Sequence, residues 1–360
     1  MTKTIVAFGN FNLHGARSWV IRTGLQESGY EIRLCRTEVK GLVSKYVDLW
    51  RRWKQCRDGA SAIYVVFLGH YLMPLAWLLG KRSKIPVIFD AFLSLYDTEV
   101  SDRARVSKFS PRAWILWLTD WISCRLADVI LIDTEENRKY FVNHYGVPAE
   151  KILVLPVGCR SDLFQSGVAS TSTDAGKFNI EFHGTYIPLQ GIETILGAAR
   201  ELQEHHPDII FTLIGSGQTH GTMTKMAADW NLQNVRFIRS VPIAELPAFV
   251  QAADVCLGIF GTTAKADRVI PNKAYEAIAC GKALITGRTT AVQRVFRDRE
   301  NVLLCSPGDP HALAESILVL KNDSHLRTVI AQGGLELTKR NFGAVEIVRL
   351  LKEWMNSKIF

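Results

Sequence analysis

Short apolar runs alternate with amphipathic stretches along the first half of the chain. The apolar runs cover residues 4–9, 62–68, 86–90, 129–132 and 152–156, and residues 30–35 form a further strand-like run in which Glu31 and Arg33 alternate with apolar residues. Stretches with helical spacing separate them, at about 16–28, 45–57, 71–80, 111–127 and 135–144. Runs that are apolar on both faces are typical of buried parallel strands, and the intervening helices predict a Rossmann-type sheet.

The second half repeats this alternation. Strands are predicted at 178–183, 209–214, 235–239, 255–260, 282–286 and 302–305, each followed by a loop and a helix. Residues 166–176 are small and polar without periodicity, which indicates a linker. The pattern therefore predicts an α/β chain with two Rossmann-like, doubly wound domains, 1–165 and 177–343, facing a cleft. A last helix within 344–360 is expected to pack back across that cleft.

One apolar segment is long enough to cross a bilayer. Residues 61–80 contain few polar positions, but Gly69, His70 and Pro74 interrupt them. We therefore predict a buried strand, a polar loop and a helix. The chain starts with a strand-like run, so no signal peptide is expected.

The charge is unevenly distributed. The net charge is +8, and residues 1–165 carry 23 Lys and Arg against 16 Asp and Glu, together with seven of the nine tryptophans. A basic, Trp-rich half suggests an anionic membrane surface or a phosphate-bearing substrate. Nucleic acid is disfavoured because no aromatic-basic RNA motif occurs. The basic segment 45–57 is either a surface helix packed by Trp50 and Trp53 or a lipid contact. The tryptophans of 111–127 form either a core stripe or a membrane-facing wedge.

The cysteines carry no metal or disulfide pattern. Seven of them are scattered without a CxxC pair or a Cys/His cluster. This distribution is typical of a reduced, cytoplasmic protein without structural disulfides or zinc.

Residues 268–281 contain the strongest candidate chemistry. Pro271 and Asn272 predict a helix start with Asn272 as the cap, and Gly281 predicts its end. Lys273 and Glu276 are three residues apart and share a helix face at the positive end of the dipole. Such a face can hold an anion beside a hydroxyl-rich group. The alternative is an ordinary helix with a solvated lysine.

The first domain offers further candidates. Gly9 and the loop after it precede a helix that could face a phosphate, and Arg17 opposes the dipole of that helix. Arg17 is therefore either exposed or bound to an anion. Asp90 at a strand end and His70 at a helix start are candidate catalytic residues. His70 could instead be a helix-start residue satisfied by the backbone.

The second half resembles the retaining nucleotide-sugar glycosyltransferases of GT-B fold, specifically family four. The resemblance covers residues 178–320, from FHGTYIPLQG through IPNKAYEAIACG to SPGDPHALAESI. It implies a UDP- or GDP-linked sugar as donor substrate, with no separate cofactor and no metal. Glu276 would accept the ribose hydroxyls. The other implied donor-binding residues are Gly184, Thr185, Gln190, Gly215, Gly217, Val241, Arg268, Lys273 and Thr290.

Three departures from the family pattern stand out. Thr185 and Gln190 occupy the positions where most members have a phosphate-binding Arg and Lys, and Arg268 replaces a glutamate. Phe92 occupies a position where a histidine is common. Lys273 and Arg268, with Arg17 from the first domain, are the expected substitutes, as in a branch with an IPNK loop.

The resemblance implies transfer to a hydroxyl group with retention of configuration and without a metal. Family habit and the basic, Trp-rich half suggest a lipid-linked glycan acceptor at the inner face of the cytoplasmic membrane, as in polysaccharide or lipopolysaccharide assembly. Alternatives are an inactive sugar-nucleotide-binding or scaffold protein and a GT-B UDP-sugar epimerase. A dehydrogenase is disfavoured because the strand after the Gly215 loop ends in Arg239 rather than in an acidic residue.

Overall fold

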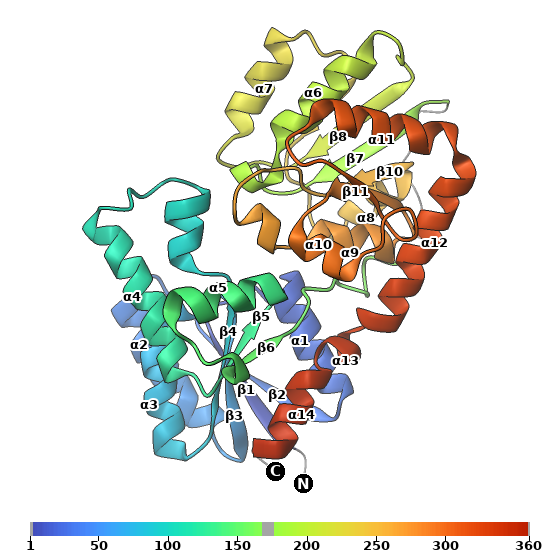
Figure 1. The fold of residues 1–360 in the computed structure, drawn as a ribbon. Helices are drawn as coiled ribbons and strands as arrows, with labels where there is room; N and C mark the ends of the chain where they lie inside the picture. The colour runs from blue at the N-terminus through green and yellow to red at the C-terminus, as the bar shows by residue number, and fades with distance from the viewer. Residues whose placement is uncertain (1–2, 168–175, 359–360) are drawn as a thin grey trace. The chain divides into compact units, whose positions relative to one another are not determined.

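The computed structural model describes residues 3–167 and 176–358, which form two compact units (Figure 1). Unit 1 comprises the chain up to Gly158 together with Gly343–Phe360, and unit 2 comprises Cys159–Phe342. Residues 159–165, predicted in the first domain, thus belong to unit 2. Most of the predicted linker 166–176 lies outside the described residues.

Unit 1 is built on a parallel sheet with the order β2-β1-β3-β4-β5-β6. Its elements are β1 (Lys3–Gly9), α1 (Ala16–Glu27), β2 (Tyr30–Arg36), α2 (Leu42–Cys56), β3 (Ala60–Val65), η1 (His70–Leu72), α3 (Met73–Ser83), β4 (Val87–Phe92), η2 (Asp97–Asp102), α4 (Pro111–Leu126), β5 (Val129–Ile132), α5 (Glu135–Tyr145), η3 (Ala149–Lys151), β6 (Ile152–Val154), α13 (Ala344–Ile347) and α14 (Arg349–Lys358).

The core of unit 1 packs α2 to α5 against one face of this sheet. Strand residues Val6, Val65 and Phe89 belong to the same buried apolar cluster as Trp53 of α2 and Phe141 of α5. The strand order reverses between β1 and β3, so the loop after Gly9 lies at the switch point where open α/β sheets bind ligands.

Unit 2 is built on a second parallel sheet with the order β12-β11-β10-β7-β8-β9. Its elements are β7 (Phe178–His183), η4 (Pro188–Gln190), α6 (Ile192–Gln203), β8 (Ile209–Ile214), α7 (His220–Asp229), β9 (Val235–Ile238), α8 (Leu246–Ala252), β10 (Val255–Leu257), η5 (Ala266–Arg268), α9 (Asn272–Ala279), β11 (Ala283–Gly287), α10 (Thr290–Val295), β12 (Leu303–Cys305), α11 (Pro310–Asn322) and α12 (Ser324–Asn341). The order reverses between β7 and β10. Two doubly wound parallel sheets confirm the predicted α/β architecture.

The C-terminal segment returns to unit 1 and packs on α1. The predicted single helix at 344–356 is two short helices, α13 and α14. A Cβ on Gly24 of α1 would lie 2.1 Å from the carbonyl oxygen of Ala344, so only glycine permits this approach. Val348, Leu351 and Met355 are fully buried.

The apolar segment 61–80 is divided as the interruption by Gly69 and Pro74 predicts. Its first residues lie in β3 and its last in α3, with η1 between them. Among the helices in 3–167 and 176–358, none is long and apolar enough to cross a membrane.

Candidate functional site

Two glycine-containing loops lie side by side at the carboxyl ends of β7 and β8 in unit 2. Gly184 follows β7 and Gly215 follows β8, and the backbone N–H groups of Gly184 and Tyr186 donate to Ile214 and Ser216 at 2.9 Å each. Gly215 has φ +140°, and a Cβ there would lie 2.0 Å from the carbonyl oxygen of Gly184. The close approach of the two loops therefore requires glycine at 215.

Lys273 lies beneath the Gly184 loop. Its side chain is only 4% exposed, its Nζ donates to Gln190 Oε1, and it lies 3.7 Å from the centre of the Phe182 ring. A Cβ on Gly184 would come within 2.7 Å of this Nζ. Burial lowers the pKa of Lys273 to about 7, although Glu181 and Glu276 favour the charged form. The solvated-lysine alternative is therefore excluded.

The helix start differs from the prediction. Pro271 occupies the cap position of α9 without a side-chain cap, and Asn272 is the first helical residue. Asn272 cannot cap because its own backbone is already helical. The predicted end is correct, since Gly281 adopts φ +67° directly after the C-cap Cys280.

A buried chain of ionisable groups, Glu181–His183–Glu276, runs beside Lys273. His183 Nδ1 donates to Glu181 Oε1 and His183 Nε2 donates to Glu276 Oε2, each at 2.8 Å. Burial disfavours the imidazolium, but the Glu181 carboxylate and the hydrogen bonds to both glutamates outweigh it and raise the pKa of His183 to about 9. The sequence analysis missed Glu181 and His183. Two polar residues at alternate positions inside the buried strand FNIEFH were the available signal.

Glu276 keeps one carboxylate oxygen for other partners. Its Oε2 accepts from His183, while no described residue donates to Oε1. The Lys273 ammonium can bind an anionic group of a ligand. The neighbouring Glu276 Oε1 can accept hydrogen bonds from hydroxyl groups of the same ligand.

We expect the His183→Gln variant to show a flatter dependence of stability on pH. A folded-state pKa of about 9, above the usual 6.5, means that the stabilisation by the imidazolium is complete below pH 6.5 and is lost as the pH rises to 9. The difference corresponds to about 3 kcal/mol. The lowered pKa of Lys273 makes the free energy of unfolding rise with pH above pH 7, opposite to the effect of His183. Lys273 is present in both proteins, so the difference in stability between wild type and variant reports on His183. Thermal unfolding from pH 6 to 10 measures it. Parallel curves would contradict the assignment.

The remaining predicted residues of unit 2 occupy other loops around this sheet. Thr185 is exposed at the tip of the Gly184 loop, and half-buried Val241 follows β9. Arg268 is the last residue of η5. The backbone N–H of Thr290 donates to the carboxylate of Asp267, the residue before Arg268, at 2.8 Å. Gly217 has φ +153° and adjoins Tyr186. The structure brings Gly184, Gln190, Lys273 and Glu276 together. The donor-binding roles stay predictions.

In unit 1, Asp90 and Arg17 form a buried ion pair. Arg17 Nε donates to Asp90 Oδ1 at 2.7 Å and Arg17 Nη1 donates to the carbonyl oxygen of Leu155 at 2.9 Å. The Tyr64 hydroxyl donates to Asp90 Oδ2 at 3.1 Å. Asp90 is 0% and Arg17 4% exposed, so an exposed Arg17 is excluded. Both Asp90 oxygens already accept hydrogen bonds.

Gly9 and Phe92 lie at the ends of β1 and β4, and Phe92 contacts Arg17 of this pair. Gly9 ends β1 with φ +140°. Phe92 ends β4 with φ +57°, a left-handed conformation that is strained for an aromatic residue, and the Arg17 guanidinium lies 4.9 Å from its ring centre. A role of Gly9 or Arg17 toward an external phosphate stays a prediction.

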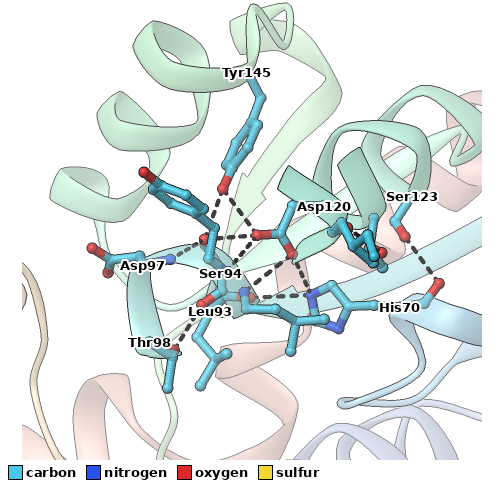
Figure 2. Close-up of polar contacts among 12 residues, drawn as sticks. His70, Leu93, Ser94, Asp97, Thr98, Asp120, Ser123 and Tyr145 are labelled. Carbon is cyan, nitrogen blue, oxygen red and sulfur yellow. Dashed lines mark hydrogen bonds and ion pairs between the residues drawn. The ribbon is translucent and has the colours of Figure 1, made fainter. Parts of the chain in front are cut away.

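His70 belongs to a buried polar network centred on Asp120 (Figure 2). His70 Nε2 donates to the carbonyl oxygen of Leu93 at 3.1 Å and lies 3.6 Å from Asp120 Oδ1. Asp120 accepts from the hydroxyls of Ser94 and Tyr145 at 2.8 and 2.9 Å. Burial lowers the pKa of His70. The hydrogen bond from His70 to the Leu93 carbonyl is what we expect if His70 is satisfied by the backbone and is not catalytic.

No cluster of three or more His, Cys, Asp or Glu suited to a metal ion occurs within the part of the chain that the structure describes. All seven cysteines are free thiols.

Two family models match the chain, one in each half. The description "Glycosyl transferase 4-like domain" applies to residues 12–158, and "Glycosyl transferases group 1" applies to residues 169–336. Together they cover most of the sequence.

Similar proteins are distant in sequence. D-inositol 3-phosphate glycosyltransferase of Corynebacterium glutamicum is 23% identical over 76% of this chain and 68% of that protein. A GDP-mannose-dependent phosphatidylinositol monomannoside mannosyltransferase of Mycolicibacterium smegmatis is 24% identical over 53% of this chain and 52% of that protein.

Solved structures share the whole fold. Sucrose-phosphate synthase of Thermosynechococcus elongatus superimposes with a TM-score of 0.75, and Anabaena HepE in complex with UDP and glucose superimposes with 0.73. Both are 15% identical, over 99% of this chain and 100% of the other. At this identity the likeness establishes the GT-B fold alone.

Proposed function

Because two glycosyltransferase family models match its two halves, we propose that the chain transfers a sugar from a nucleoside-diphosphate sugar to a hydroxyl group of a lipid-linked glycan, with retention of configuration and without a metal ion. The observation that carries the proposal is Lys273, buried under the Gly184 loop beside Glu276 at the switch point of unit 2. A buried lysine next to helix N-termini suits an anionic leaving group.

The donor is a UDP- or GDP-linked sugar. HepE has been solved with UDP and glucose, and the mycobacterial mannosyltransferase is named for GDP-mannose, which supports this class by analogy. In our scheme Glu276 Oε1 accepts the ribose hydroxyls while His183 holds Oε2. Lys273 and Gln190 replace the phosphate-binding cation that the family usually has at position 190.

Charge develops on the β-phosphate as the bond from the sugar to the leaving group breaks. Lys273 and the N-terminus of α9 would stabilise this charge, and the contribution requires the protonated amine. With a pKa of about 7 in the unliganded protein, Lys273 would take up a proton as the diphosphate binds. Front-face attack by the acceptor hydroxyl accounts for retention.

Asp90 and His70 enter the scheme as positioning residues. Both are buried and hydrogen-bonded, and each lies next to the segment that follows β4. Direct participation in proton transfer stays a prediction for either residue.

A membrane-bound acceptor explains the surface of α2. Trp53 is buried and Trp50 packs under Arg82, so both tryptophans of α2 face inward. The outward face carries Leu42, Val43 and Val47, which are 49%, 78% and 46% exposed, among lysines and arginines. This combination supports peripheral binding to an anionic membrane from the cytoplasmic side, in the assembly of a polysaccharide or lipopolysaccharide.

We expect Val43→Glu to reduce flotation of the protein with vesicles rich in phosphatidylglycerol. The substitution removes an exposed apolar side chain and adds repulsion from the anionic surface, at about 1 kcal/mol for each charge near it. The matched control is Val319→Glu, a 37% exposed valine of α11 in unit 2. Equal flotation of the two variants, or no binding by the wild type, would count against the membrane role.

The proposed function is tested by thermal-shift screening of nucleotides and nucleotide sugars, followed by a transfer assay. A ligand at a hundredfold over its dissociation constant adds about 2.7 kcal/mol. Stabilisation of the wild type but not of Lys273→Ala/Glu276→Ala, with transfer unaffected by EDTA, is the expected result.

A catalytically inactive sugar-nucleotide-binding protein is the second candidate, favoured by Thr185 and Gln190 at the usual cation positions. It predicts stabilisation by nucleotide without turnover. A UDP-sugar epimerase would convert the donor without an acceptor.

A further inference from the structure

A small cavity in unit 1 lies outside the site described so far. It has a volume of about 260 Å³ and is lined by Tyr96, Lys108, Trp114, Trp117 and His144. These residues come from the segment after β4, the loop before α4, α4 itself and the end of α5. The volume is below the ~300–1,000 Å³ of a typical ligand pocket, so it can enclose only part of a large molecule.

The walls of this aromatic pocket are ordered by ring contacts. Trp117 lies 6.0 Å from Trp114 edge to face, and Trp121 stacks behind it at 6.4 Å. Across the pocket Tyr96 lies 5.7 Å from His144. The pocket is therefore formed before a ligand arrives.

The Asp120 network drawn in Figure 2 holds two of the segments that line the pocket. Asp120 is fully buried and accepts from the backbone N–H groups of Leu95 and Tyr96 at 3.1 and 3.0 Å. It also accepts from the hydroxyl of Tyr145, which contacts Trp117 at 5.9 Å between ring centres. The Asp120 carboxylate thus fixes the Tyr96 wall of the pocket directly and the Trp117 wall through Tyr145.

The rim of the pocket is apolar and cationic. Phe109, Trp114, Ile115 and Leu118 are 84%, 69%, 58% and 44% exposed. The last three share one face of α4 because Leu118 lies four residues after Trp114 and three after Ile115. Lys108 lies over the Phe109 ring at 4.9 Å. From residue 103 to 125 every exposed charged side chain is a cation: Arg105, Lys108, Arg112 and Arg125.

An apolar strip that continues into an aromatic pocket with a single lysine fits an amphiphile with an anionic head. We propose that the pocket binds the phosphate end of a long-chain lipid phosphate, with the phosphate at Lys108, the first part of the chain against the Trp114 and Trp117 rings, and the rest along Ile115 and Leu118. The inference deepens the proposed function because it locates the lipid moiety of the acceptor.

The test uses farnesyl diphosphate below its aggregation concentration, titrated into the full chain by calorimetry. We expect binding that Lys108→Ala and Trp114→Ala each weaken at least tenfold. The matched controls, Lys81→Ala and Trp77→Ala on α3, are exposed positions outside the pocket and should leave the affinity unchanged. All four substitutions are at exposed positions, so the fold is expected to persist.

Three results would overturn the proposal. The first is no binding, or unchanged affinity in both pocket variants. The second is inorganic diphosphate binding as tightly as farnesyl diphosphate, which would indicate a free-phosphate site. The third is loss of vesicle binding in Trp114→Ala without any binding of monomeric farnesyl diphosphate, which would indicate a bilayer contact. The thermal shift with UDP or GDP tests unit 2 independently, so failure of the donor site is distinguishable from failure of this pocket.

Discussion

Replacing Lys273 by alanine is expected to lower kcat by about 10²- to 10³-fold, the effect of removing one preorganised group that stabilises developing charge. Lys273 is the cation that the structure places under the Gly184 loop, and its Nζ donates to Gln190, the last residue of η4. Initial rates of sugar transfer with saturating donor measure the effect.

The variant needs two controls. Lys273→Met keeps the packing over Phe182 but removes the charge, so it should be as inactive as the alanine variant. Lys282→Ala removes a half-buried lysine of the same segment outside the cluster and should be neutral. Wild-type turnover in Lys273→Met would show that the phosphate is held by other groups.

Asp90→Ala is expected to destabilise unit 1 by about 3–5 kcal/mol. The substitution leaves the Arg17 guanidinium buried without its carboxylate partner and removes the acceptor of the Tyr64 hydroxyl. For a unit of this size each 1 kcal/mol lowers Tm by about 2–4 °C, so the shift is easily measured by calorimetry.

A double variant separates the ion pair from the loss of volume. Arg17→Met/Asp90→Leu removes both charges and restores apolar bulk, so it should recover much of the stability that Asp90→Ala loses. If Asp90→Ala unfolds at the wild-type temperature but abolishes transfer, Asp90 is catalytic rather than structural.

Elements of the fold were predictable from the sequence because most strands are short runs rich in apolar residues and the helices between them carry helical periodicity. The interruption of 61–80 by Gly69 and Pro74 was sufficient to distinguish a strand and a helix from a membrane span. Asn272 was assigned as the cap although Pro271 is the cap and Asn272 the first helical residue. The sequence Pro-Asn fits a helix that begins at either position, and it does not distinguish between the two.

The site was predictable only where the residues are neighbours in sequence. Lys273 and Glu276 share a helix, whereas Arg17 and Asp90 are 73 residues apart and His183 and Glu276 are 93 apart. A pairing between distant positions depends on strand order and register, which the hydrophobic pattern does not determine. For the same reason Lys273 could be placed on the correct helix but not recognised as buried.

The return of Gly343–Phe360 to unit 1 has a consequence for biosynthesis. On the ribosome, residues 3–158 emerge before unit 2, but α1 still lacks the helices that cover Val20 and Gly24. Unit 1 therefore cannot complete its fold until all of unit 2 has been translated, and unit 2 can fold before it. Nascent chains are expected to show protease-resistant unit 2 before resistant unit 1, the reverse of the usual order in multidomain proteins.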